Sequence, residues 1–174
     1  MLAVIVIVSI FAFYVISNRS HHTPVKLTNN PQLKPGDLVF LNGKGLSDWM
    51  MRWVLQFQVT HAMIAIGDGT NNVIECGSEG VRIRSVENIP IVTRRVKKEL
   101  LPEDILREYQ KYRLVKFTDD LITEWMFGYK LNSHMHCSEF VGNVLVDLGL
   151  MDATTTTHLL SPQDLLVNKS VLYE

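Results

Sequence analysis

The first sixteen residues constrain this chain most, because fifteen of them are apolar and none is charged. A helix over residues 1–16 would span roughly 24 Å, against the ~30 Å hydrocarbon core of a bilayer, and Ser17 and Asn18 could extend it into the interface. The segment lacks the basic start and the small-x-small cleavage site of a signal peptide. We therefore expect a membrane anchor over residues 1–18, inserted through residues 2–16. A cleaved signal that releases a secreted protein, and a buried core helix, are the alternatives.

The charges that follow this segment predict its orientation. Arg19 and Lys26 lie on its C-terminal side, whereas its N-terminal side carries only the α-amino group. The positive-inside rule then predicts a single-pass protein whose body lies in the cytoplasm. Residues 19–36 are polar, contain three prolines and show no periodic apolar face, which is typical of a linker. The folded domain is therefore expected over residues 37–174.

The overall composition excludes several classes of protein. A chain with 47% apolar residues and a net charge of −1 is not intrinsically disordered. Two cysteines are too few for a disulfide-based scaffold. The sequence pI of about 6.6 argues against a nucleic-acid partner. Neither the composition nor any motif calls for a cofactor, so none is expected.

The pattern of residues 37–174 predicts an α+β domain in which an antiparallel sheet packs against helices. Strands are expected at 37–41, 61–66, 73–76 and 81–85, and the last three form a meander joined by Gly, Asn and Asp turns. A weaker alternation indicates a strand at 112–117, and the basic run at 94–98 lies outside any clear element. Helices are expected to start at Ser47, Pro102, Thr118, Cys137 and Ser161, with Gly149 ending the fourth.

Cys137 is the strongest candidate for a nucleophile. The N–H groups and the dipole at a helix start lower the pKa of a thiol there. His61 can serve as its base, and Glu75 in the next strand can hold the far ring nitrogen. The alternative is that all three residues are structural. The rival thiol of Cys76 lies within a strand, on the face opposite Glu75, and is better interpreted as a core residue.

Five motifs, in this order, resemble one family. The chain is similar to the circularly permuted NlpC-type branch of the papain-like cysteine hydrolases. Within that branch the YiiX-like proteins and their poxviral counterparts resemble it most, and the lecithin retinol acyltransferase group is a more distant relation. The motifs are LKPGDLVF at 33–40, THAMIAIGDG at 60–69, VIE at 73–75, HCSEFV at 136–141 and LSPQDL at 160–165.

The resemblance implies a permuted papain-like fold and a role for each site residue. Cys137 would be the nucleophile, His61 its base and Glu75 the residue that orients the base. The implied activity is a thiol hydrolase that cleaves an amide, ester or thioester through an acyl-enzyme. Together with the expected membrane anchor it predicts a membrane-anchored enzyme, for which the tether suggests a lipid-linked substrate and peptide substrates stay open. The acyltransferase group usually has a histidine in place of Glu75, which favours the YiiX-like pattern. Unpermuted NlpC enzymes commonly have an acid where this chain has His136, which weakens the case for peptidoglycan cleavage.

A metal site is the first rival interpretation. His134, His136 and Cys137 place three potential ligands within four residues, and His61 or Glu75 could be a fourth. Structural zinc sites usually show paired spacings such as C-x₂-C, which this chain lacks. No metal is therefore expected.

The second rival is a catalytically inactive, membrane-tethered interaction module of the same fold. Trp49, Met50 and Trp53 would then form a lipid or partner surface, and the basic residues of 94–98 would meet anionic headgroups. The simpler interpretation is that these aromatic residues face the core and that the basic run is a solvated loop.

Overall fold

The computed structural model describes residues 26–29, 31–43, 46–53, 57–118 and 134–173. The predicted anchor at 1–18 and the predicted helix after Thr118 lie outside these ranges, so both stay predictions. Among the described helices, none combines the length and the apolar character that crossing a bilayer requires.

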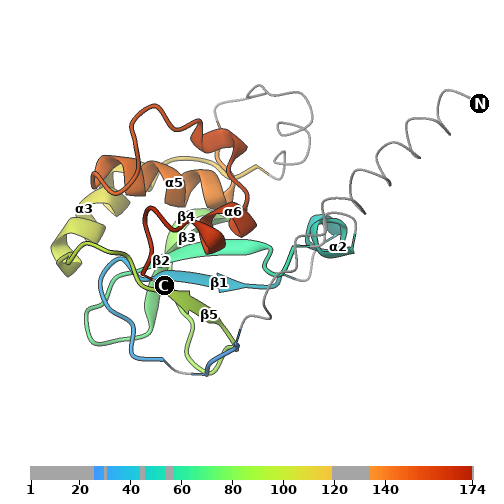
Figure 1. The fold of residues 1–174 in the computed structure, drawn as a ribbon, viewed down its shortest axis with the longest axis horizontal. Helices are drawn as coiled ribbons and strands as arrows, with labels where there is room; N and C mark the ends of the chain where they lie inside the picture. The colour runs from blue at the N-terminus through green and yellow to red at the C-terminus, as the bar shows by residue number, and fades with distance from the viewer. Residues whose placement is uncertain (1–25, 30, 44–45, 54–56, 119–133, 174) are drawn as a thin grey trace, which may run out of the picture.

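A five-stranded antiparallel sheet forms the centre of the domain, in the order β4-β3-β2-β1-β5 (Figure 1). This arrangement confirms the predicted α+β class and the meander. The strands are β1 (Leu38–Leu41), β2 (His61–Ala65), β3 (Asn72–Gly77), β4 (Gly80–Ser85) and β5 (Val92–Arg94). The helices are α2 (Leu46–Trp53), α3 (Pro102–Tyr112), α5 (Cys137–Asp147), the 3-10 turn η1 (Thr157–Leu159) and α6 (Pro162–Val167).

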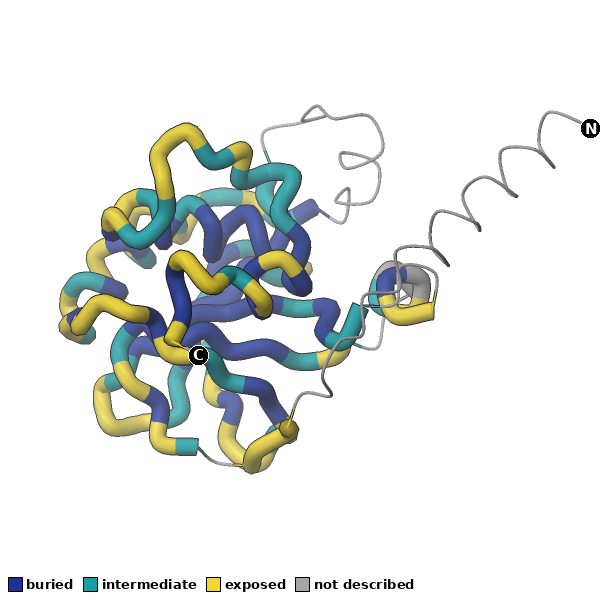
Figure 2. The backbone as a smooth tube through the Cα atoms, in the orientation of Figure 1, coloured by how far each residue is buried: buried dark blue, intermediate teal, exposed yellow. Residues whose placement is uncertain are grey.

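The two faces of the sheet bury separate apolar clusters. Alternate strand residues such as Ile64 and Ile74 face α3, α5 and α6, which lie together on one side (Figure 1). Residues of the opposite parity, such as Met63 and Val73, form a smaller cluster on the other side. Figure 2 shows the buried residues concentrated in the sheet and in α5.

The second cluster includes Leu33, which belongs to the predicted linker. Leu33 is buried, and Thr28 forms a β-bridge with Ile91. The described part of residues 19–36 therefore packs against the domain before the expected start at residue 37. The boundary between anchor and linker stays a prediction.

Capping residues mark the ends of α5 and α6, and the His136 cap was not predicted. His136 caps α5 by accepting the N–H of Glu139, and Gly149 follows the helix with φ of 68°. Ser161 and Asp164 form a capping box around the start of α6, with Pro162 at its first position. The helix starts at Cys137 and Pro162 are thereby confirmed.

The predicted strand at 112–117 is wrong. The helix α3 continues through Tyr112, whose ring meets that of Phe140 edge-on with centroids 5.8 Å apart. This aromatic contact favours one more turn of helix. Within residues 112–117, only Phe117 forms a β-bridge, and its partner is Met135. The short strand β5 was not predicted, because its three residues lie partly within the basic run.

Candidate active site

Strands β2 and β3 separate at one end, and this separation makes room for Cys137. Their pairing is confined to Ile64 with Ile74 and Ala65 with Val73, whereas β3 pairs with β4 along its whole length. At the open end, the Ala62 N–H points to the Cys137 thiol. On the other side of the gap, the Cys76 thiol donates to the carbonyl of Met135 at 3.4 Å. The start of α5 and the residues just before it therefore contact both strands at this open end.

Cys137, His61 and Glu75 form a chain of contacts with His61 in the middle. The His61 ring hydrogen-bonds the Cys137 thiol. Its Nε2 lies 2.9 Å from Oε2 of Glu75, which leaves Nδ1 to face the sulfur. His61 and Glu75 share one face of the sheet, as the alternation of two neighbouring strands requires. The structure thus brings together the three residues selected from the sequence.

The electrostatics of this contact favour a thiolate–imidazolium pair. Burial lowers the pKa of His61, but the Cys137 thiolate and Glu75 outweigh burial and raise it to about 10. Burial raises the pKa of Cys137, but the charge and hydrogen bond of His61 outweigh this and hold it below the usual 9.0. The backbone N–H groups of Ala62 and Ser138 act in the same direction. Such a pair is a preformed nucleophile and proton donor.

Glu75 is held by two arginines that the sequence analysis did not select. Its side chain is only 2% exposed, and burial raises its pKa. His61, Arg82 and Arg84 outweigh burial and lower the pKa to about 2. Nε of Arg82 lies 2.9 Å from Oε1, and Nη1 of Arg84 lies 3.2 Å from Oε2. The only sequence signal was the Arg-x-Arg alternation in the strand next to Glu75.

The His136 ring forms hydrogen bonds that hold the start of α5 in place. Its Nδ1 accepts the Glu139 N–H at 3.1 Å, and its Nε2 donates to the carbonyl of His158 at 3.0 Å. Both ring nitrogens are therefore engaged within the protein. Within the described ranges, no three His, Cys, Asp or Glu side chains lie close enough to share a metal ion.

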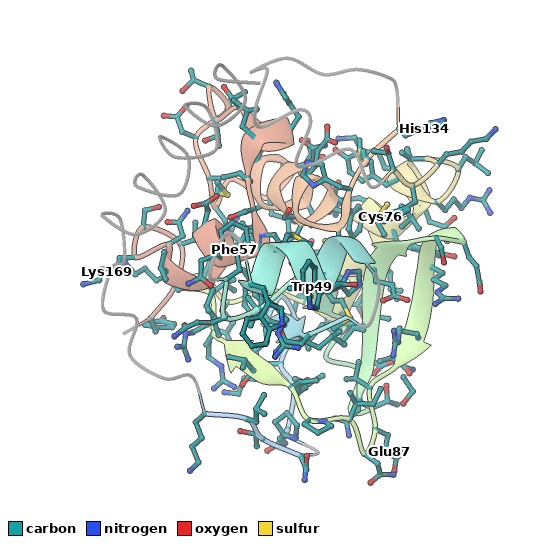
Figure 3. The ribbon with its side chains drawn as sticks, turned by 90° about the vertical axis from the view of Figure 1, so that its right-hand side faces the viewer. Trp49, Phe57, Cys76, Glu87, His134 and Lys169 are labelled. Carbon is teal, nitrogen blue, oxygen red and sulfur yellow. The ribbon has the colours of Figure 1, made fainter. Side chains whose placement is uncertain are left out.

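The rival thiol of Cys76 is fully buried in the core cluster, which confirms its interpretation as a core residue. In Figure 3 the labelled His134 lies near the outer edge of the molecule, farther out than the labelled Cys76.

The expectation that the aromatic residues of 49–53 face the core is wrong for both tryptophans. Trp49 and Trp53 are 54% and 65% exposed and do not face the core. Figure 3 shows Trp49 on α2 in front of the sheet.

Three residues of the basic run, Arg95, Lys97 and Lys98, are exposed, which agrees with the expected solvated loop, but the side chains of Arg95 and Lys98 are also bonded to the fold. Arg95 forms a bidentate ion pair with Asp37, with two hydrogen bonds of 3.2 Å. Lys98 donates to the carbonyl of Leu148 at 2.7 Å.

Comparison with known proteins defines the fold class. No model of a known protein family matches the chain. The crystal structure of the metalloprotein YiiX from Escherichia coli O157:H7 aligns with a TM-score of 0.62 and 14% sequence identity, over 83% of this chain and 98% of YiiX. The chain therefore has the fold of YiiX.

One curated relative carries a name that describes an activity. It is the probable lipoprotein peptidase YaeF of Escherichia coli (strain K12), 38% identical over 63 residues. The matched stretch covers 36% of this chain and 22% of YaeF. The likeness thus concerns about a fifth of the relative's length.

Proposed function

We propose that this chain is a cysteine hydrolase of the NlpC type, with Cys137 as nucleophile, His61 as proton carrier and Glu75 as the residue that orients His61. The observation that carries the proposal is the chain of contacts from the buried Glu75 carboxylate through the His61 ring to the thiol at the start of α5. The YiiX fold and the similarity to a probable peptidase support it.

The reaction would proceed through an acyl-enzyme. The Cys137 thiolate attacks the carbonyl carbon of an amide, ester or thioester, and backbone N–H groups at the start of α5 can stabilise the oxyanion. The His61 imidazolium gives its proton to the leaving group as the acyl bond breaks. Neutral His61 then takes a proton from water, the resulting hydroxide attacks the thioester, and Cys137 leaves as a thiolate. The proton on His61 restores the ion pair.

YiiX is described as a metalloprotein, but the donor set here does not fit a metal at this site. The His136 ring is engaged through both nitrogens, and His61 is shared between Cys137 and Glu75. No step of the proposed reaction passes through a metal.

The proposal includes tethering of the enzyme to a membrane through residues 2–16, with a peptide or lipid-linked acyl substrate. An uncharged segment with fifteen apolar residues of sixteen supports this part. A tether would keep the site close to membrane-associated substrates, which raises their effective concentration.

Activity-based labelling tests the nucleophile. We expect a dipeptide acyloxymethyl ketone to label the full-length protein at one cysteine, identified by peptide mass spectrometry as Cys137. Cys137→Ala should abolish labelling and His61→Ala should slow it about 100-fold, because the thiolate loses its partner. Cys76→Ala is the matched control and should label like the wild type.

Labelling that survives Cys137→Ala but disappears in Cys76→Ala would overturn the assignment. A folded wild-type protein that labels at no pH from 5 to 9 would favour the inactive interaction module.

A further inference from the structure

Strand β4 directs two arginines at the same buried carboxylate. Arg82 lies directly opposite Glu75 in the β3–β4 ladder, and Arg84 lies opposite Val73, one diagonal step away. The alternation of β4 puts both guanidinium groups on the face that carries His61 and Glu75. A row of side chains thus runs across three strands, from His61 through Glu75 to the two arginines.

The two arginines are engaged to different extents. Arg82 contacts Oε1 of Glu75 through Nε and Nη2, both at 2.9 Å, and Glu79 through Nη1. Arg84 contacts Glu75 through Nη1 alone, at 3.2 Å and 3.5 Å from its two oxygens. Within the described residues, Nε and Nη2 of Arg84 have no acceptor, and its side chain is 31% exposed. Arg84 therefore retains N–H donors that another anion could use.

The charges of the row leave one positive charge in excess. Glu75 carries one negative charge, Arg82 and Arg84 carry two positive charges, and the Cys137 thiolate balances the His61 imidazolium. When Cys137 is acylated and His61 has given up its proton, the excess is still one positive charge. Arg82 alone, with two nitrogens on Oε1, supplies a close counter-ion for Glu75. Glu79 is 71% exposed, so solvent screens its charge.

We propose that Arg84 is a subsite that binds a carboxylate of the substrate beside the scissile acyl bond. The proposal rests on the proposed hydrolase site and names its substrate class, an acyl compound with a free carboxylate close to the bond that is cut. Arg84 and the His61 ring both contact Oε2 of Glu75, so a carboxylate bound by Arg84 would lie on the same face of the sheet as the His61 ring. A guanidinium matches a carboxylate better than an ammonium does, because it offers parallel N–H donors.

Two small alkylating agents of similar size test this subsite without knowledge of the natural substrate. Iodoacetate carries a carboxylate and iodoacetamide a neutral amide, and with each the thiolate sulfur forms a bond to carbon as iodide leaves. The ratio of the two alkylation rates at Cys137 reports attraction of the carboxylate and cancels changes in thiolate content. We expect Arg84→Gln to lower the iodoacetate-to-iodoacetamide ratio about 5-fold, the effect of one partly exposed ion pair.

The controls keep the charge or change it elsewhere. Arg84→Lys keeps the positive charge, so its iodoacetate-to-iodoacetamide ratio should lie between those of the wild type and Arg84→Gln. Arg94→Gln removes the same charge from β5, at the other edge of the sheet, and should leave the ratio unchanged. In the wild type the ratio should fall as salt rises from 0.02 to about 0.5 M, since salt screens the attraction, and this measurement needs no variant.

The outcomes separate this inference from the proposed function. A ratio in Arg84→Gln equal to that of the wild type, or an equal loss of both rates, would show that Arg84 only positions Glu75 and would overturn the subsite. An insensitivity of the wild-type ratio to salt would overturn it as well. If neither reagent modifies Cys137 in the folded wild type, the hydrolase itself fails.

Discussion

At the scale of single residues, the site depends on a proton shared between a thiol and an imidazole. Glu75 stabilises the charged form of His61, and His61 stabilises the thiolate of Cys137. Both effects must overcome burial, which acts against every charge in the row. The carboxylate can do so because it has partners in the imidazole and two guanidinium groups.

The pH dependence of Cys137 alkylation tests this coupling. Because its pKa is lowered, we expect the rate with iodoacetamide to rise through an inflection below pH 9.0 and to level off above it. Glu75→Gln lowers the pKa of His61, so the inflection should move up by about one pH unit. Hydrolytic activity should fall as pH rises through about 10, where His61 loses the proton that the leaving group needs.

Cys76→Ala serves as the background for these rates, since it leaves Cys137 as the single thiol. An inflection at or above pH 9.0 in that background would contradict the ion pair.

At the scale of elements, the loop from η1 to α6 supports α5, the helix that carries Cys137. The His158 carbonyl accepts Nε2–H of His136, and the Leu160 carbonyl accepts the Ser138 hydroxyl at 2.7 Å. These two bonds hold the residues on either side of Cys137. The motif at 160–165 therefore acts on the site through the backbone, although its own side chains do not take part in the chemistry.

Removal of the His136 ring should loosen this support. His136→Ala loses the helix cap and leaves the His158 carbonyl without its donor, so we expect a loss of about 2 kcal/mol in the free energy of unfolding. Urea denaturation followed by circular dichroism measures it. His158→Ala is the matched control, because it removes an imidazole but keeps the carbonyl, and it should cost less. A His136→Ala protein within about 0.5 kcal/mol of the wild type would show that the cap is unimportant.

The sequence predicted the elements that have local signals. The helix at Cys137 and the capping box at Ser161 depend on residues within four positions of each other, which one sequence displays. The contact of His61 with Glu75 follows from alternation in neighbouring strands. The roles of Arg82 and Arg84 could not be predicted, because an alternating Arg-x-Arg on a strand usually marks a solvent face, and only the register turns it toward Glu75.

At the scale of the whole molecule, the apolar segment at residues 1–18 predicts attachment to a membrane. If residues 1–18 anchor the chain, the full-length protein should stay with membranes after alkaline carbonate extraction, and a variant without residues 1–18 should be released. Replacement of Ile5 and Val8 by Asp is the matched control, because it keeps the length and adds charges that cost about 2.5 to 3.5 kcal/mol each in a bilayer. Full-length protein that carbonate extracts would contradict the anchor.

The opening between β2 and β3 makes thiol activation a property of the complete fold. The sheet supplies His61 and Glu75 from residues 61–77, but Cys137 follows sixty residues later, on a helix that must pack against the open end of these strands. Before docking, the thiol has no imidazolium beside it and keeps the weak reactivity of an ordinary cysteine. The chain thus has no reactive thiolate at Cys137 while it folds. Rapid alkylation of Cys137 therefore measures the fraction of molecules that have reached the native state.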